Sequence, residues 1–288
     1  MLASSFTRQS LLALLLSVFA AGAIGQVQPA QKPFEPSVGQ EGKDVVWVPT
    51  SQALVDKMLN IAKVTASDYV IDLGSGDGRT VISAAKRGAR ATGIEYNPDM
   101  VELSKSNAAK EGLSAQTNFL KADLFESDFS QATVITMFLL PDINLKLRPK
   151  ILDLKPGTRI MSNTFTMGEW KDDETAMVEE SAGCSYYCTA HLWIVPAKVE
   201  GTWRLAQGEL TLKQSFQMFS GTLRTGGNML TIANGKLRGD QISFSAGGAE
   251  YTGRVNGNTI QGTVKGSSPG SWNATRIGAN LAAAPAKY

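Results

Sequence analysis

The eight residues DLGSGDGR, from Asp72 to Arg79, constrain the fold of this 288-residue chain more than any other stretch. They follow a short apolar and β-branched run, residues 69–73, which is typical of a buried strand in a parallel sheet. After Arg79, apolar residues recur with helical spacing up to Arg87. Glycines at such a turn accept positive φ and let a ligand approach the backbone, because no Cβ stands in the way. The stretch therefore predicts a ligand-binding turn in an α/β domain.

The glycine spacing separates two cofactor classes that use such a turn. A dinucleotide site requires G-x-G-x-x-G, in which the third glycine lets the helix pack closely on the strand. Counting from Gly74 and Gly76, that third position is Arg79, so the dinucleotide interpretation fails there. The remaining D-x-G-x-G-x-G pattern resembles the glycine-rich motif of the class I S-adenosylmethionine-dependent methyltransferases, whose cofactor has no phosphate and tolerates a nearby acid. The resemblance gives these cofactor-binding candidates: Asp72, Gly74, Ser75, Gly76, Asp77 and Gly78.

Two further strands of the predicted sheet end in acidic residues. The second strand leads to Glu95, about 20 residues after the glycine turn, where a carboxylate can hydrogen-bond ribose hydroxyls. The third strand, residues 117–121, leads into Asp123 and Leu124, and the resemblance places an Asp here against the adenine amino group. A single acidic strand end is more often simply solvated. Together with Asp72, however, three such ends fall in register, which favours a cofactor pocket.

Predicted strands and helices alternate from residue 44 to residue 196. Thr50 or Ser51 can cap an entry helix, and Pro98 suits the first turn of a later one. Further strands are expected at 132–139, 159–165 and 191–195, and a further helix at 144–154. This alternation predicts an α/β fold with a doubly wound, Rossmann-like sheet that binds ligands at the carboxyl ends of its strands.

Motifs along the same segment are similar, in order as well as content, to those of one subfamily. It comprises the small seven-β-strand protein-lysine methyltransferases whose mitochondrial members modify the adenine nucleotide translocase and the ATP synthase c-subunit. The motifs are VPT (48–50), GIE (93–95), ADL (122–124), MFLLP (137–141) and SNTF (162–165), with Trp170 nearby. The resemblance implies S-adenosylmethionine as the methyl donor and a protein lysine as the acceptor. It also implies that Thr50 lies near the methionine end of the cofactor, and that Phe138 and Pro141 line the acceptor channel.

The MFLLP turn bears on the acceptor independently. Enzymes that methylate a base or amide nitrogen commonly carry Asn or Asp at the head of this turn, and this chain has Phe138. An apolar, aromatic rim suits an aliphatic amine, because desolvation lowers the pKa of a lysine and exposes its lone pair. Transfer is expected by direct in-line displacement, with the protein supplying alignment and exclusion of water. Phe138, Phe165 or Trp170 could face the cation, although core packing is the commoner role of such residues.

Cysteine and histidine are scarce in this chain. Cys184 and Cys188 are the only cysteines and His191 the only histidine, so no structural zinc site and no other metal site is expected. An oxidising compartment would permit a bond between the cysteines if the chain turns between them, but not along one continuous strand. His191 is interpreted as a structural residue, because it lies on a late strand away from the cofactor.

Residues 197–277 change composition toward Gly, Thr, Ser and Asn and alternate in strand fashion. They predict a small antiparallel all-β domain, either a meander or a barrel. GKLRGDQI (235–242) recurs as GRVNGNTI (253–260), and residues 201–203 could pair with residues 271–276. The domain either binds a partner or stabilises the chain, and residues 278–288 are expected to form a disordered tail.

The N-terminus predicts export. Arg8 precedes an apolar run at 11–21, the layout of a signal peptide that ends near residue 25, and the protein would then lie in the periplasm or cell envelope. The run is too short for a membrane span, so no stable transmembrane segment is expected after cleavage. Residues 26–43 have the composition of a flexible linker. The formal net charge of +2 gives no electrostatic case for a nucleic-acid partner.

Two functions remain open from the sequence. One is an S-adenosylmethionine-dependent methyltransferase that acts on protein lysine. The alternative is an exported binding protein that holds S-adenosylmethionine, its demethylated product or another adenosine compound without turnover. The intact loop and the three carboxylates favour a working pocket, whereas the cytosolic origin of the cofactor argues against turnover outside the cell.

Overall fold

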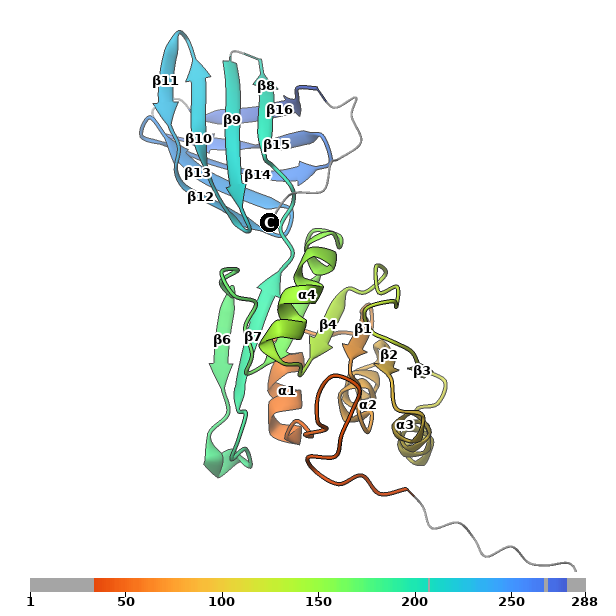
Figure 1. Ribbon diagram of the computed structural model, residues 1–288. Helices are drawn as coiled ribbons and strands as arrows, with labels where there is room; N and C mark the ends of the chain where they lie inside the picture. Colours follow the sequence, from red (N-terminus) through yellow and green to blue (C-terminus); the bar gives the residue numbers. More distant parts are fainter. Residues whose placement is uncertain (1–33, 207, 267–268, 279–288) are drawn as a thin grey trace, which may run out of the picture. The chain divides into compact units, whose positions relative to one another are not determined.

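A computed structural model describes residues 34–206, 208–266 and 269–278 (Figure 1). The predicted signal peptide, the first part of the linker and residues 279–288 lie outside these ranges. The described residues form two sheets, one of seven strands and one of nine. None of the helices in these ranges is both long enough and apolar enough to cross a bilayer.

Strands and helices alternate in the first sheet, as predicted. The elements in chain order are α1 (Gln52–Ile61), β1 (Tyr69–Leu73), α2 (Arg79–Lys86), β2 (Arg90–Glu95), α3 (Pro98–Lys110), β3 (Thr117–Lys121), β4 (Val134–Met137), α4 (Pro141–Leu152), β5 (Arg159–Asn163), β6 (Glu174–Met177), the 3₁₀ helix η1 (Glu180–Ala182) and β7 (Thr189–Ile194). Their order across the sheet is β3-β2-β1-β4-β5-β7-β6, with the first five parallel and β7 antiparallel to both of its neighbours. The doubly wound fold is thus confirmed. The chain order reverses between β1 and β4, the position at which such folds bind ligands.

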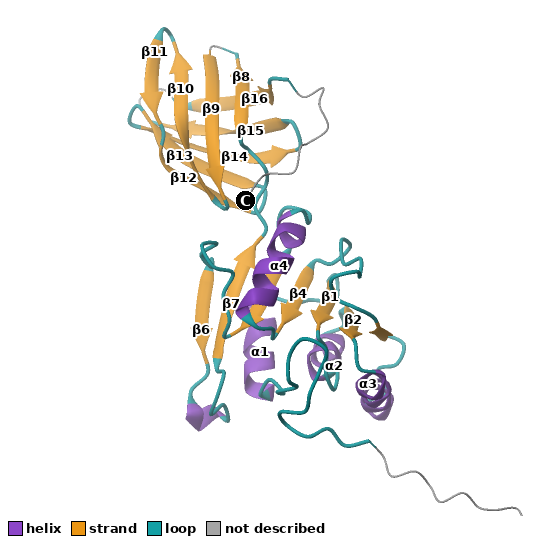
Figure 2. Ribbon diagram, in the orientation of Figure 1, coloured by secondary structure: helices purple, strands orange, loops and turns teal. Residues whose placement is uncertain are grey.

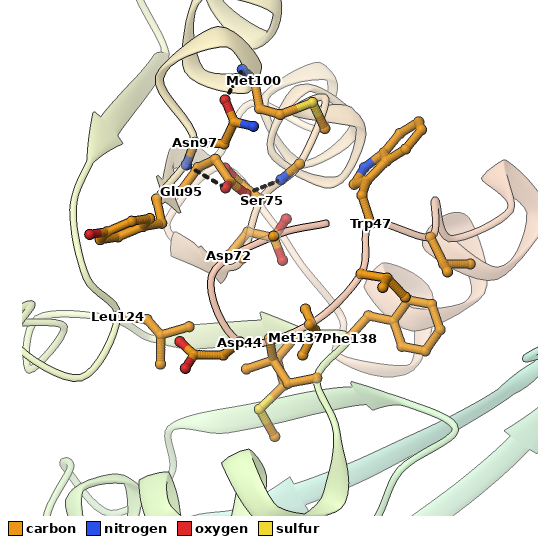
Figure 3. Close-up of a pocket in the computed structure, with 18 of the residues that line it drawn as sticks. Asp44, Trp47, Asp72, Ser75, Glu95, Asn97, Met100, Leu124, Met137 and Phe138 are labelled. Carbon is orange, nitrogen blue, oxygen red and sulfur yellow. Dashed lines mark hydrogen bonds between the residues drawn. The ribbon is translucent and has the colours of Figure 1, made fainter. Parts of the chain in front are cut away.

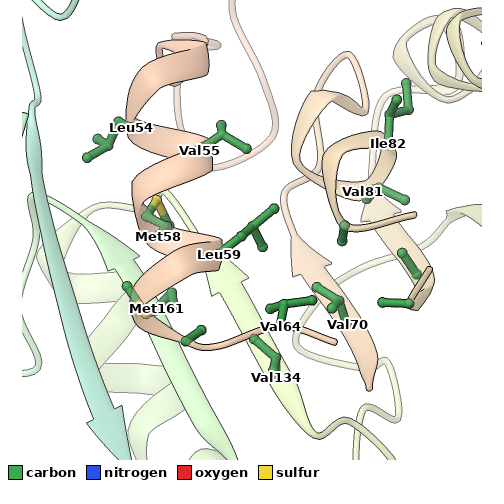
Figure 4. Close-up of a cluster of buried hydrophobic side chains, with 14 of the residues drawn as sticks. Leu54, Val55, Met58, Leu59, Val64, Val70, Val81, Ile82, Val134 and Met161 are labelled. Atoms are coloured by element: carbon green, nitrogen blue, oxygen red, sulfur yellow. The ribbon is translucent and has the colours of Figure 1, made fainter. Parts of the chain in front are cut away.

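Helices cover both faces of this sheet (Figure 2). Successive side chains of a strand point to opposite faces, so Val70 and Ile71 of β1 enter different cores. Val70 packs in a buried cluster with side chains of α1, α2 and α3 (Figure 4). Ile71 packs in a second cluster with side chains of α4. Each such buried aliphatic side chain stabilises the fold by about 1.5–3 kcal/mol.

The helix starts follow local sequence signals. Ser51 caps α1 and Asn97 caps α3, each by accepting a hydrogen bond from a backbone N–H of the first turn. Pro98 lies in the first turn of α3, as predicted. Pro141 takes the same position in α4, so that helix begins three residues before Asn144, the predicted start. Pro141 thus sets a helix start.

The second sheet closes into a barrel. Its strands are β8 (Gly201–Leu205), β9 (Gly208–Ser215), β10 (Met218–Thr225), β11 (Asn228–Thr231), β12 (Ala233–Arg238), β13 (Gln241–Ala246), β14 (Ala249–Asn256), β15 (Thr259–Lys265) and β16 (Gly270–Arg276). Every neighbouring pair is antiparallel, and β9 also pairs with β10. The predicted pairing of the first segment with the last is confirmed, because Thr275 of β16 pairs with Arg204 of β8.

The sequence repeat corresponds to two equivalent hairpins. Leu237 and Ile242 pair across the turn between β12 and β13, and Val255 and Ile260 pair across the turn between β14 and β15. All four side chains are buried in the barrel core. The repeated pattern therefore encodes one unit, in which an apolar pair points inward on each side of a glycine turn.

Candidate active site

A cavity of about 540 Å³ lies at the carboxyl ends of the parallel strands (Figure 3). Its volume falls in the range of small-molecule sites, about 300–1,000 Å³. The predicted residues that line it are Thr50, Asp72, Gly74, Ser75, Gly76, Asp77, Glu95, Asp123, Leu124 and Phe138. Two predicted residues, Gly78 and Pro141, are not among its lining. The structure therefore brings together nearly all of the site that the sequence predicted.

The glycines of the loop are required for backbone geometry and for close contacts. Gly76 has φ +53°, and a Cβ there would lie 2.6 Å from Nε1 of Trp47. Gly78 has φ +82° and precedes α2, where a Cβ would lie 2.8 Å from the ring of Phe119. Gly76 therefore shapes the cavity wall, whereas Gly78 permits the packing behind it.

Glu95 connects the loop to the end of β2. Its two carboxylate oxygens accept hydrogen bonds from the backbone N–H of Gly76 and of Asn97, both at 2.9 Å (Figure 3). Each oxygen of an ionised carboxylate has a second lone pair, so both can still accept from a ligand hydroxyl. Glu95 thus holds the loop and presents acceptor atoms to the cavity.

Asp72 is the most perturbed acid of the site. Its side chain is only 6% exposed and accepts a 2.6 Å hydrogen bond from Oγ1 of Thr136 on β4. Burial raises the pKa of Asp72 to about 7, and the negative charges of Glu95 and Asp77 also act to raise it. Asp72 therefore changes charge near neutral pH unless a cation binds beside it.

Asp77 engages a neighbour within the motif. Its carboxylate forms an ion pair with Arg79, with Nη2 and Oδ2 2.6 Å apart. Nη1 of Arg79 donates to the backbone carbonyl of Thr50 at 2.8 Å. Asp77 thus fixes the segment that enters α1, and Thr50 with it, at the cavity wall.

The chain between residues 39 and 47, here called the strap, lines the cavity as well. Backbone hydrogen bonds join Gly39 and Gln40 to Trp47, and Lys43 forms an ion pair with Asp123. The hydrogen bond from Lys43 lowers the pKa of Asp123. Residues 39–43 belong to the segment predicted as a flexible linker, and their contacts with Asp123 and Trp47 are ones that composition does not reveal.

Ser75 supplies an unused polar group. Its side chain is 5% exposed, and its Oγ has no hydrogen-bond partner among the described residues. A buried hydroxyl without a partner costs free energy, about 1–3 kcal/mol. The Oγ lies against Gly93 of β2, where a Cβ would be 2.4 Å away, so a ligand in the cavity reaches this hydroxyl only after a change of its rotamer. The carboxylates of the cavity present acceptor atoms, which fit a ligand with hydroxyl and amino groups.

The SNTF motif builds the opposite end of the cavity. Oγ of Ser162 donates to the carbonyl of Phe165 at 2.6 Å, and Nδ2 of Asn163 donates to Oγ1 of Thr50 at 3.1 Å. These bonds turn Phe165 toward the cavity, where Phe138 also lies. Trp170, by contrast, is fully buried in the core, with its ring centroid 6.2 Å from that of Trp193.

Tyr187 is a lining residue that the sequence analysis missed. It lies in the loop between β6 and β7, and Cys184 and Cys188 are disulfide-bonded around it. The chain turns at Tyr187, which has φ +56°, and this turn is the condition under which the sequence permitted the bond. The close spacing of the two cysteines was the only available signal.

His191 contacts Asp172 and lies outside the cavity lining. Its Nδ1 lies 3.2 Å from Oδ2 of Asp172. Within the described ranges, no three His, Cys, Asp or Glu side chains gather closely enough to hold a metal ion.

Comparison with known proteins gives matches to about half of this chain. The model of the ANTKMT methyltransferase domain matches residues 72–174. A protein-lysine N-methyltransferase from Saccharolobus islandicus is 43% identical over 139 residues, which cover 47% of this chain and 86% of that one. The lysine N-methyltransferase of the ATP synthase c-subunit from Xenopus laevis is 34% identical over 128 residues, 44% of this chain and 56% of that one.

A solved structure also matches. It is the crystal structure of an RNA methyltransferase from Salinibacter ruber in complex with S-adenosyl-L-homocysteine. The two chains are 45% identical, the match covers 53% of this chain and 96% of that one, and the TM-score is 0.49.

Proposed function

We infer that this chain, which belongs to the protein-lysine N-methyltransferase family, transfers the methyl group of S-adenosylmethionine to a lysine side chain of a protein. Family membership follows from the match to the Saccharolobus islandicus enzyme, most of whose length this chain covers. The resemblance to class I methyltransferases inferred from the motifs is thereby confirmed. The chain spans only about half the length of the Xenopus laevis enzyme, and that enzyme's acceptor is not carried over.

One observation carries the proposal. The carboxylates of Glu95 and Asp123 and the glycine loop line one side of the cavity, Phe138 and Phe165 line the other side, and Trp47 and Tyr96 are also part of the lining. The strand order gives the same division, because Glu95 and Asp123 follow β2 and β3, whereas Phe138 and Phe165 follow β4 and β5. Asp72, on β1, lies between the two halves. A polar half beside an aromatic half suits a nucleoside cofactor beside an alkylamine acceptor.

The residues of the polar half fit S-adenosylmethionine. Glu95 has free lone pairs for the ribose hydroxyls, and Ser75 has an unpartnered hydroxyl among the described residues. Asp123 would accept a hydrogen bond from the adenine amino group. Lys43, which now forms an ion pair with Asp123, competes with the adenine for this carboxylate. Thr50, held by Asn163 and Arg79, and the buried Asp72 would face the methionine part, whose charge stabilises an ionised Asp72.

The protein's part in transfer is alignment. When bound, S-adenosylmethionine would supply a methyl group on a positively charged sulfur. The sulfur leaves as a neutral thioether, which is a good leaving group and permits direct in-line displacement. Phe138 and Phe165 would hold the acceptor side chain and exclude water from it. Apolar surroundings also lower the pKa of a lysine, which exposes the nitrogen lone pair at neutral pH. No side chain is assigned as a general base.

We also propose that the protein works outside the cytoplasm. The apolar run that follows Arg8 supports export, and the bond between Cys184 and Cys188 is consistent with an oxidising compartment. Fractionation of the cells that make the protein tests this location. Full-length protein found in the cytosol, with residues 1–25 still attached, would contradict this location.

Calorimetry and methyl transfer test the function in two steps. S-adenosylmethionine is titrated into protein that lacks residues 1–25, and a dissociation constant in the micromolar range is expected. The same protein is then incubated with labelled S-adenosylmethionine and an envelope extract, and label should appear on lysine after hydrolysis. Binding without label would favour the adenosine-compound-binding alternative, and label on RNA would replace lysine as the acceptor.

A further inference from the structure

Three aromatic rings from separate segments meet at the acceptor half of the cavity. Phe138 follows β4, Phe165 follows β5, and Tyr187 precedes β7, and all three line the cavity. The ring centroid of Tyr187 lies 5.2 Å from that of Phe138 and 6.1 Å from that of Phe165. Phe138 and Phe165 are 6.0 Å apart, with an angle of 21° between their planes. The rings thus form a continuous wall, here called the aromatic wall.

Tyr187 is held in the aromatic wall by the loop around it. It has φ +56°, a conformation that is uncommon for a residue with a bulky side chain. The disulfide between Cys184 and Cys188 closes the loop on both sides of it. Cys184 is anchored in the core at 2% exposure, and the carbonyl of Cys188 accepts a 2.9 Å hydrogen bond from the backbone N–H of Val178. Both ends of this five-residue loop are therefore fixed to the first domain.

The loop gives its two tyrosines different surroundings. Tyr186 is 84% exposed and does not line the cavity, whereas Tyr187 is 46% exposed and does. A tyrosine needed only to pack would be buried. Tyr187 is thus both part of the cavity lining and partly exposed, so an incoming side chain can reach it.

We propose that Tyr187 is a specificity-determining residue that attracts the ammonium group of the acceptor as it enters the cavity, before the amine loses its proton, and that the Cys184–Cys188 bond holds Tyr187 in place to do so. The proposal rests on the proposed lysine transfer and extends it to a loop that no motif assigns. An aromatic face attracts a cation electrostatically, and the same ring contacts an aliphatic stem. A neutral molecule of the same shape has only the second contact. The aromatic wall should therefore bind a cation more tightly than a neutral molecule of the same shape.

Choline and 3,3-dimethylbutan-1-ol provide that comparison, because they differ only in a charged nitrogen replaced by carbon. Dissociation constants are measured by NMR titration of protein saturated with S-adenosylhomocysteine. Wild-type protein should prefer choline by about fivefold. Tyr187→Phe should keep most of this preference and Tyr187→Ala should lose it. Tyr186→Ala, the matched control, should behave as wild type. No preference in wild type, or a full preference in Tyr187→Ala, would overturn the proposal.

The role of the disulfide is tested by coupling. Cys184→Ala with Cys188→Ala should lose the choline preference, and adding Tyr187→Ala should cause no further loss, because both changes act through one ring. Wild-type protein reduced with dithiothreitol should also lose the choline preference. This measurement tests the disulfide even if the double cysteine variant does not fold. Preference retained after reduction would remove the disulfide from the proposal. Calorimetry with S-adenosylhomocysteine on the same samples measures cofactor binding separately. Loss of cofactor binding in wild-type protein would contradict the proposed function and not the role of Tyr187.

Discussion

In the first sheet, polar side chains gather where neighbouring parallel strands end, whereas in the barrel the inward side chains are apolar along the strands. Asp72, Glu95 and Asp123 line one cavity, while Trp203, Leu210 and Ile260 are fully buried in the barrel core. Parallel strands place all their carboxyl ends at one edge, so a few residues from distant parts of the chain can serve one ligand. Antiparallel strands alternate their ends and give a stable core without such an edge. The chemistry should therefore depend on the first sheet alone.

The largest effect is expected from removing the carboxylate that connects loop and ligand. Glu95→Ala leaves the backbone N–H groups of Gly76 and Asn97 without their acceptor and removes the carboxylate proposed to contact the ribose. Affinity for S-adenosylmethionine should fall about 1,000-fold, or about 4 kcal/mol, as measured by calorimetry. Glu250→Ala, an exposed carboxylate on β14, is the matched change in the barrel and should leave affinity unchanged. Equal losses in both variants would break the comparison between the two sheets.

The next effect concerns pH. The pKa of Asp72 is raised from 3.8 to about 7, so the folded state binds more protons than the unfolded state between these values. The free energy of unfolding therefore falls as pH rises through this range, and above about pH 7 the whole cost is present. Asp72→Asn should be more stable than wild type at pH 8, by about 4 kcal/mol, and nearly equal to it at pH 4. Urea denaturation at both pH values measures the difference.

The same substitution should separate stability from binding. Wild type should bind S-adenosylmethionine more tightly at pH 8 than at pH 6, because the ligand's positive charge favours ionised Asp72. Asp72→Asn should bind weakly and show no such dependence. Asp240→Asn, which removes the partner of Arg254 in the barrel, should change neither property. A wild-type affinity that does not vary with pH would contradict the role given to Asp72.

The smallest effect compares two glycines with almost the same backbone. Gly76 has φ +53° and Gly257 has φ +55°, so alanine should cost each position about 1 kcal/mol of folding stability. A Cβ at Gly76 would also meet Trp47 of the strap, whereas Gly257 has nothing within 4 Å. Gly76→Ala should therefore also weaken cofactor affinity about tenfold, and Gly257→Ala should not. Thermal unfolding and calorimetry measure the two quantities separately.

Local patterns allowed most of the first sheet and its polar site to be predicted. Each acidic strand end and each glycine of the loop lies next to a clear strand or helix signal, and parallel pairing then brings the strand ends together. The strap and Tyr187 could not be predicted in this way. Their positions depend on contacts with residues far away in the sequence, such as Lys43 with Asp123. The edge strand β6 was also missed, because its four residues are largely exposed and lack a buried face.

The barrel shows how a turn signal can mislead. Asn234-Gly235 resembles a hairpin turn, yet both residues lie within β12. The pairing of β12 with β13 shifts register between Ala233 and Lys236, and Asn234 has φ +54°, as at a β-bulge. A Cβ at Gly235 would lie 2.2 Å from the carbonyl oxygen of Phe219. The dipeptide therefore bends a continuing strand instead of ending it, which only the pairing partner reveals.

The pairing of β8 with β16 has a consequence for how such a chain can arise. The barrel's first and last strands are neighbours, so the segment enters and leaves the barrel side by side. A unit whose two ends lie together can be inserted between two segments of another chain without moving those segments apart.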